Sequence, residues 1–436
     1  MDLHLRRGGG FLRWSVMMIV FMFILADNKP NKVVASSRRT SFTLLGSAPS
    51  PSPHSPSPSP SPSPPPTGMC ESSVIIWGYQ CQEFYVTTED GYVINMQRIS
   101  TSGGGRSSGG GGGKVNKQPV LLQHGILVDG MIWLLSTHQS LGFILADSGF
   151  DVWIVNTRGT RYSRGHVNLN ASQLEYWNWS WDELVQYDHP AIFEFVYNQT
   201  RQKLHYVGHS LGTTVALAAF SEGKSVDKLR SAALLSPVAY ISHISQIAII
   251  GAKSFLCEIA MVMGVVEFNL KEDDVANFIN SLCVDLRLDC YELISEISGN
   301  NYRFNDSTLD LFWKDEPQAT STKTMVHLTQ NVRDGTFSKF NYGSQEMNIE
   351  HYGQEKPPIY NLSNIPRNLP LFLGYGGQDN LADLVDVKKL LEKLKLHKIE
   401  DLTTLFINGY AHNDFPMGSN AKDKVYDPLI SFFGRH

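Results

Sequence analysis

Residues 204–220 read LHYVGHSLGTTVALAAF and decide the fold. The first four residues form a short apolar run typical of a buried strand, and the stretch after Gly212 is typical of a helix. A strand that turns directly into a helix brings two stretches of backbone close together. Gly208 and Gly212 suit that crossing because they lack side chains. We therefore expect a sharp, strained strand-to-helix turn with Ser210 at its tip.

Short apolar runs recur on both sides of this turn, at residues 119–123, 150–156, 231–237, 369–377 and 401–409. Because these runs are apolar throughout, they suit strands that are covered on both faces. A helical stretch opened by a capping box of Ser180 and Glu183 precedes the strand at 204–208. Earlier in the chain, Glu89-Asp90-Gly91 predicts a hairpin turn. Together the pattern predicts an α/β fold with a mostly parallel central sheet.

The alternation of strands and helices stops near residue 240 and resumes near 369. An interval of ~125 residues is far longer than an ordinary connection. It predicts an inserted subdomain at 241–368 between two parts of one core, 68–240 and 369–436. Residues 247–268 of the insert are apolar, but Lys253 and Glu258 argue against a membrane span. We expect one or two helices there, which either contact an acyl chain or serve packing alone.

The residues after Ser210 supply candidates for the rest of a catalytic triad. A serine hydroxyl is a weak nucleophile near neutral pH, so it needs a base and an acid that orients the base. In folds with this turn, the acid and then the base follow the serine, each after a late strand. His412 follows the last predicted strand, and Asp379 directly follows the strand before it. Asp383 is the rival acid, but it resembles the first turn of the next helix.

Two backbone amides are candidates for the oxyanion hole. One is the amide of Leu211, which follows the nucleophile. The other is the amide of Ile126, in a loop that leaves the strand at 119–123, where Gly125 lets the backbone approach a substrate closely. His124 is assigned no role beyond shaping this turn. These positions predict a serine carboxylic-ester hydrolase.

At this level of detail the chain resembles the acid lipase family, which includes gastric and lysosomal acid lipases and plant relatives, over residues 71–436. The resemblance implies the α/β-hydrolase fold, Asp379 rather than Asp383 as the acid, and a mainly helical cap with a lid in the insert. It also implies hydrolysis of triacylglycerols or sterol esters through an acyl-enzyme, at a lipid–water interface. The motifs that carry it are Trp77-Gly-Tyr, Thr88-Glu-Asp-Gly-Tyr, Gln123-His-Gly, Asp151-Val-Trp, Asn156-Thr-Arg-Gly, the turn at Ser210, Gly376-Gly-Gln-Asp-Asn-Leu-Ala-Asp and Tyr410-Ala-His-Asn-Asp-Phe.

Some features depart from the animal members of that family. Those enzymes carry glutamine after the nucleophile, where this chain has Leu211. Because the donor there is a backbone amide, we expect the leucine to leave catalysis intact. Its side chain can still change the substrate preference. A Ser/Pro-rich spacer and the pair Cys70 and Cys81 also fit a plant member better. Three alternatives stay open: a short-chain esterase, an acyltransferase that passes the acyl group to an alcohol, and a non-catalytic lipid-binding protein.

The N-terminal segment predicts entry into the secretory pathway. Arg6, Arg7 and Arg13 precede an apolar run, residues 15–26, that is short for a membrane span, so residues 1–26 are interpreted as a signal peptide. A retained signal anchor is the alternative. Residues 27–67 form a Ser/Pro-rich spacer that is expected to be disordered or extended. The mature protein is expected to be secreted, or vacuolar or lysosome-like, without a transmembrane span.

Five N-glycosylation sequons agree with that route, at Asn170, Asn178, Asn198, Asn305 and Asn361. The chain has five cysteines, an odd number for an oxidising compartment. We expect Cys70 to pair with Cys81, and one bridge among Cys257, Cys283 and Cys290, with Cys283 and Cys290 as the candidate pair.

The remaining features limit the kinds of partner. A net charge of -5 and a mixed charge pattern favour neither nucleic acid nor an anionic membrane surface. The glycine-rich run at 103–113 does not fit a phosphate-binding loop, because no Ser or Thr follows Lys114. The cysteine spacing matches no zinc site. We expect no cofactor and no metal, and the oligomeric state is left open.

Overall fold

The structure is a computed structural model that describes residues 68–101, 117–270, 298–299 and 304–436. The predicted signal peptide and spacer lie outside the described residues, as do the glycine-rich run at 103–113 and the candidate pair Cys283 and Cys290.

A nine-stranded sheet forms the centre of the described chain, in the order β1-β2-β4-β3-β6-β7-β10-β11, with β5 beside β2. All neighbours from β4 to β11 are parallel, whereas β2 runs antiparallel to β1, β4 and β5. The mostly parallel sheet expected from the apolar runs is confirmed. Its strands are β1 (Tyr79–Thr87), β2 (Tyr92–Thr101), β3 (Pro119–Gln123), β4 (Asp151–Val155), β5 (Gly165–His166), β6 (Leu204–His209), β7 (Leu229–Leu235), β10 (Leu371–Gly376) and β11 (Leu402–Ile407).

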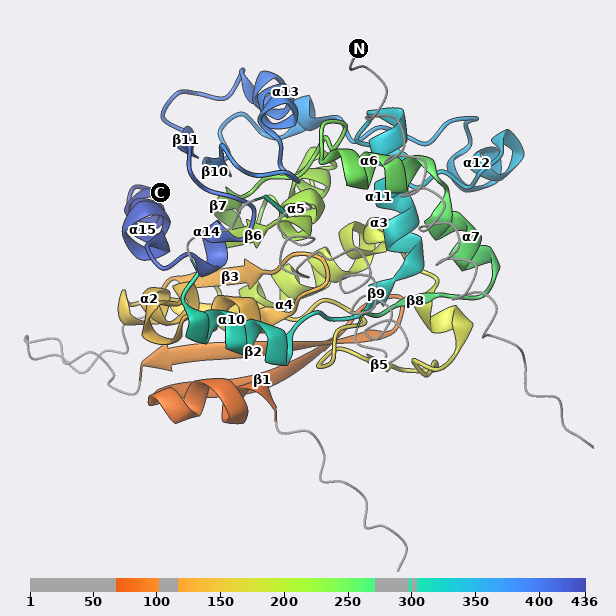
Figure 1. The fold of residues 1–436 in the computed structure, drawn as a ribbon. Helices are drawn as coiled ribbons and strands as arrows, with labels where there is room; N and C mark the ends of the chain where they lie inside the picture. The colour runs from red at the N-terminus through yellow and green to blue at the C-terminus, as the bar shows by residue number, and fades with distance from the viewer. Residues whose placement is uncertain (1–67, 102–116, 271–297, 300–303) are drawn as a thin grey trace, which may run out of the picture. The chain divides into compact units, whose positions relative to one another are not determined.

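Helices cover both faces of this sheet (Figure 1). Along β3, Leu121 packs into a core shared with α4, α5 and α13, and Val120 and Leu122 pack into a second core with α2 and α15. This two-sided burial is the reason that the strands are apolar throughout. The helices are α2 (Leu141–Asp147), α3 (Trp181–Glu183), α4 (His189–Thr200), α5 (Leu211–Ser221), α13 (Leu384–Leu394), α14 (Asp414–Met417) and α15 (Asp427–Phe433). Shorter helices are η1 (Cys70–Val74), η2 (Ile75–Trp77), η3 (Gly130–Trp133), η4 (Thr137–Gln139) and η5 (Leu174–Trp177).

Two π-helical turns interrupt the helices in a way that the apolar pattern does not predict. The capping box of Ser180 and Glu183 begins α3 as expected, but η6 (Leu184–Asp188) then separates α3 from α4. Likewise, η8 (Lys422–Tyr426) precedes α15. Pro190 and Pro428 are the second residues of the helices that follow. A proline has no N–H for the carbonyl four residues before it, so a wider turn at this point fits the missing donor.

The described part of the insert is mainly helical. Its elements are α6 (Gln246–Lys253), α7 (Leu256–Val262), β8 (Glu267–Phe268), α10 (Asp306–Asp315), β9 (Thr320–Ser321), α11 (Thr322–Asp334), α12 (Gln345–Tyr352) and η7 (Leu362–Asn364). Helix α11 packs against α6 and α7 (Figure 1), and Arg333 pairs with Glu258. The apolar stretch at 247–268 is broken at Phe255, which has a φ of 56°. Within the described residues, no helix is both long and apolar enough to cross a membrane.

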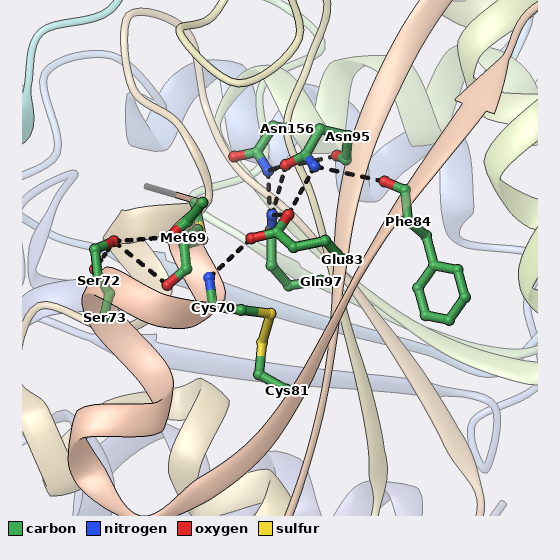
Figure 2. Close-up of a disulfide and its surroundings, with 11 residues drawn as sticks. Met69, Cys70, Ser72, Ser73, Cys81, Glu83, Phe84, Asn95, Gln97 and Asn156 are labelled. Carbon is green, nitrogen blue, oxygen red and sulfur yellow. Dashed lines mark hydrogen bonds between the residues drawn. A yellow bond between two sulfur atoms is a disulfide. The ribbon is translucent and has the colours of Figure 1, made fainter. Parts of the chain in front are cut away.

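A disulfide between Cys70 and Cys81 joins η1 to β1, the pairing expected from the sequence (Figure 2). The carboxylate of Glu83 lies beside it and accepts a hydrogen bond from the Cys70 amide at 2.8 Å. The same carboxylate accepts hydrogen bonds from the side-chain amides of Asn95 at 2.7 Å and Gln97 at 2.8 Å. These bonds attach the start of the described core to the first two strands.

Candidate active site

Ser210 lies on the turn between β6 and α5, with a φ of 52° and a ψ of −118°. A positive φ is unfavourable for a residue other than glycine and persists only where neighbouring contacts hold it. Here the Ser210 amide donates to the Leu235 carbonyl at 3.2 Å, and the Ser210 carbonyl accepts from the amides of Thr213 and Thr214 at 2.8 and 3.2 Å. The strained turn expected from the sequence is present, held by the next strand and the first turn of α5.

The glycines around Ser210 stand where no side chain fits. A Cβ on Gly212 would lie 2.6 Å from the Gln123 carbonyl oxygen, and one on Gly208 would lie 2.9 Å from the Gly212 carbonyl carbon. A Cβ on Gly125 would lie 2.9 Å from the Ser210 Cβ. The loop after β3 therefore passes directly against the turn that carries Ser210.

His412 and Asp379 form a buried pair. Nδ1 of His412 lies 2.9 and 3.1 Å from the two carboxylate oxygens of Asp379. Nε2 of the same ring is buried and has no hydrogen-bond partner among the described residues. Asp383 instead caps α13, because its carboxylate accepts from the Val385 amide at 2.7 Å. The geometry thus brings Asp379, and not Asp383, against His412.

The charge on Asp379 is stabilised despite its burial. Burial alone would raise the pKa of the Asp379 carboxyl, but the charge and hydrogen bond of His412 and the amides of Ala382 and Leu381 together hold that pKa below its usual value. These amides donate to the Asp379 carboxylate at 2.8 and 2.9 Å. A carboxylate that stays ionised favours the proton on Nδ1 of His412, which leaves Nε2 able to accept one.

Two side chains that the sequence pattern did not identify hold the backbone of His412. Nε2 of His209 and Oγ of Ser236 each donate to the His412 carbonyl at 3.0 Å. The rings of His209 and His412 lie 4.9 Å apart between centroids. Burial, followed by the charge on His412, lowers the pKa of His209 to about 3, so His209 is a neutral hydrogen-bond donor. The residue next to Ser210 thereby connects the strained turn to the loop of His412.

The loop with Ile126 is held by His124. The Thr157 amide donates to Nε2 of His124 at 3.0 Å, so Nδ1 carries the proton and donates to the Gly125 carbonyl at 2.7 Å. Burial lowers the pKa of His124, which keeps the ring neutral. Ile126 is half-buried, and Leu211 begins α5, where a helical amide has no acceptor within its own helix.

The insert contacts the loops of both His412 and Asp379. The His412 amide donates to the Ser298 carbonyl at 3.1 Å. Gly299 has a φ of 92°, and a Cβ there would lie 1.8 Å from the Gln378 carbonyl oxygen. Only glycine fits that position, directly beside the residue that precedes Asp379.

The remaining predicted residues lie away from this cluster. The five sequon asparagines, Asn170, Asn178, Asn198, Asn305 and Asn361, are all exposed. Cys257 has no disulfide, and burial raises the pKa of its thiol to about 11. Among the described residues, no three His, Cys, Asp or Glu side chains gather as a metal site requires.

Comparisons with known proteins identify the family of this chain. Residues 118–418 match the family model described as the alpha/beta hydrolase fold, and residues 70–137 match the partial alpha/beta-hydrolase lipase region. Triacylglycerol lipase 2 of Arabidopsis thaliana is 55% identical over 84% of this chain and 88% of that protein. Human lysosomal acid lipase/cholesteryl ester hydrolase is 35% identical over 85% and 92%. The chain belongs to the acid lipase family. This acid lipase is a carboxylic-ester hydrolase.

The fold of this acid lipase also matches solved structures. A soluble variant of monoglyceride lipase from Saccharomyces cerevisiae aligns with a TM-score of 0.53 and 14% identity, over 82% of this chain and 95% of that one. At that identity the match concerns the fold alone.

Proposed function

We propose that this acid lipase hydrolyses lipid esters through Ser210 as nucleophile, His412 as general base and Asp379 as the acid that orients His412. The observation that carries the proposal is the buried His412, with Asp379 on Nδ1 and, among the described residues, no partner on Nε2. Its backbone carbonyl is bonded by His209, the residue before the strained Ser210. In such a ring, Nδ1 is bonded to the carboxylate, and Nε2 is left to accept a proton.

The reaction follows from these positions. As Oγ of Ser210 attacks the ester carbonyl carbon, its proton passes to Nε2 of His412, and Asp379 stabilises the imidazolium. The amides of Ile126 and Leu211 donate to the oxyanion of the tetrahedral intermediate. The bond to the alcohol then breaks, and His412 protonates the departing oxygen. A water, deprotonated by His412, hydrolyses the acyl-enzyme and regenerates Ser210.

The substrates we propose are triacylglycerols or sterol esters at a lipid–water interface. The names of the relatives support this choice, since one is a triacylglycerol lipase and another a cholesteryl ester hydrolase. Exposed apolar side chains on and beside α7, including Ile259, Val262 and Met263, would favour contact with lipid. The insert would then form the cap that receives the acyl chain.

A nucleophile test uses two serines of the same region. Ser210→Ala should abolish hydrolysis of p-nitrophenyl butyrate, by roughly 10⁴-fold or more, while the melting temperature stays within a few degrees. Ser221→Ala, a buried serine at the end of the same helix, should keep full activity. Full activity of Ser210→Ala would refute the proposal.

A substrate test compares initial rates on emulsified triolein, emulsified cholesteryl oleate, a galactolipid and soluble short-chain esters. We expect the first two to be hydrolysed. Activity on the soluble esters alone would make the protein a short-chain esterase and would remove the lipid role of the insert.

We also propose passage through the secretory pathway. The Cys70–Cys81 disulfide and the exposure of all five sequon asparagines support it, because disulfides persist in oxidising compartments and glycans need an accessible side chain. Protein from plant cells should shift to lower mass on treatment with an N-glycanase that accepts plant glycans. An unchanged mass would contradict glycosylation.

A further inference from the structure

One segment of the insert lies against the loop that carries Ile126. It comprises residues 315–318, from the last residue of α10 into the connection to β9, and it contacts the chain between β3 and η3. The Gln318 amide donates to the Leu127 carbonyl at 2.8 Å, and the Asp129 amide donates to Oε1 of Glu316 at 3.1 Å. The two bonded residues, Leu127 and Asp129, stand directly before and after Val128 in the sequence. The insert therefore holds the residues that directly follow Ile126.

The loop needs this support because its backbone is strained. Leu127 has a φ of 59°, in the left-handed region that is unfavourable for a leucine. Such a conformation persists only where the surroundings impose it. The core holds the loop before Ile126 through His124 and Gly125. After Ile126, the bonds to Leu127 and to the Asp129 amide both come from the insert.

Glu316 is an unusual residue to find in this place. Its side chain is fully buried, and its Oε2 atom has no hydrogen-bond partner among the described residues. Asp129 faces it, with one oxygen accepting from the Met131 amide and the other from Nε of Arg161, each at 2.8 Å. Arg161 also pairs with Asp315 at 2.8 Å. Arg161 therefore pairs with both Asp129 and Asp315, and Glu316 beside them forms no ion pair with any residue that the structure describes.

The protonation of Glu316 follows from these neighbours. Burial and then the negative charge of Asp129 raise the pKa of the Glu316 carboxyl well above its usual range, although the hydrogen bond from the Asp129 amide and the charge of Arg161 lower it. A neutral Glu316 accepts from the Asp129 amide through Oε1 and places no second negative charge beside the Asp129 carboxylate. An ionised Glu316 would repel that carboxylate in a buried site.

We propose that Glu316 is a positioning residue, through which the insert holds the loop of the oxyanion-hole amide of Ile126. The inference rests on the proposed function, since it assigns that amide to the oxyanion. On this proposal, the insert does more than cover the substrate, because it also fixes the position of an oxyanion-hole donor. Because a small displacement of an oxyanion donor weakens its bond to the transition state, loss of Glu316 should lower kcat more than it raises KM.

The proposal has a pH dependence with a definite sign. A carboxyl whose pKa is raised in the folded state stabilises that state fully at acid pH, and the contribution is lost as the pH rises through the folded pKa. The loop should therefore be held best when Glu316 is protonated, and kcat should fall on the alkaline side as it ionises. Glu316→Gln keeps an acceptor for the Asp129 amide, and it cannot ionise.

The experiment measures kcat and KM on p-nitrophenyl butyrate from pH 4 to 9 for the full chain and three variants. Glu316→Ala should lose roughly 10- to 100-fold in kcat with little change in KM. Glu316→Gln should retain a kcat close to the parent and lose the alkaline decline due to Glu316. The matched control is Glu258→Ala, which removes a different carboxylate of the insert, one that pairs with Arg333. This variant should have a lower thermal stability and an unchanged kcat.

A second readout reports on the oxyanion hole itself. Diethyl p-nitrophenyl phosphate should phosphorylate Ser210, and its phosphoryl oxygen should take the oxyanion position. The rate of inactivation should fall in Glu316→Ala in parallel with kcat, and stay normal in Glu316→Gln and Glu258→Ala. If Glu316→Ala loses only stability and keeps its kcat, the proposal is overturned.

If Glu316→Ala does not fold, the pH profiles decide. An alkaline decline that is identical in Glu316→Gln and the parent would overturn the proposal, and its disappearance would support it. Failure of the proposed function would look different, because the parent would then not hydrolyse esters or the phosphate reagent would not label Ser210.

Discussion

The α/β core and the insert contribute to the candidate site in different ways. The core holds Ser210 through its own backbone and through glycines that let the loop after β3 touch the turn. The insert reaches the same site at a few separate points, the Ser298 carbonyl and the Glu316 side chain among them. In the proposed mechanism, the core therefore provides the reacting groups, while the insert holds the loops that surround them.

The largest expected effect concerns the choice of acid in the core. Asp379→Asn should lower kcat roughly 10⁴-fold, because a neutral amide cannot stabilise the imidazolium and favours the wrong tautomer of His412. The matched control is Asp383→Asn, which alters only the cap of α13 and should keep activity within about twofold, since an asparagine also caps helices. Rates on p-nitrophenyl butyrate measure both. Equal losses in the two variants would contradict the assignment.

A second prediction addresses the close contact between loops of the core. Gly212→Ala would place a Cβ 2.6 Å from the Gln123 carbonyl oxygen, which must displace the loop that carries Ile126. We expect kcat to fall roughly 100-fold and the free energy of unfolding to fall by about 1–3 kcal/mol. In Gly434→Ala the nearest atoms would lie at 3.6 Å, so both quantities should stay near the parent values in chemical denaturation and rate assays.

A third prediction addresses the support of His412. Ser236→Ala removes one of the two donors to the His412 carbonyl, so we expect a loss of about 1 kcal/mol in stability and a drop in kcat of roughly fivefold. Urea denaturation and steady-state rates check it, with Ser221→Ala as the control. An unchanged kcat would mean that His209 alone suffices to hold this backbone.

The smallest effect is expected for an exposed side chain of the insert. Val262 is 84% exposed on α7, and Val262→Asp should reduce hydrolysis of emulsified triolein by roughly threefold and spare soluble esters, because a charge there opposes contact with lipid. Ile399, 93% exposed on the core, provides the control Ile399→Asp. An equal loss of triolein hydrolysis in both variants would contradict a specific role of the insert in lipid contact.

Predictability from the sequence follows the same division. The turn at Ser210, the strands around it and the positions of Asp379 and His412 were predictable, because glycine spacing, apolar runs and strand ends are local signals. The bond between His209 and the His412 carbonyl joins residues 203 positions apart, and the bond between Asp129 and Glu316 joins residues 187 apart. No local pattern reveals such pairs. The π-helical turns before Pro190 and Pro428 were also missed, although each proline was a visible signal.

The sequence by itself determined the α/β fold, the strained turn and the order of the candidate reacting groups, because each depends on residues within one strand, turn or helix. The tertiary structure alone decided that His209 and Ser236 hold the His412 backbone and that Glu316 meets Asp129 next to the loop of Ile126. These outcomes depend on how distant segments pack, and packing is decided by the burial and hydrogen bonding of the whole core.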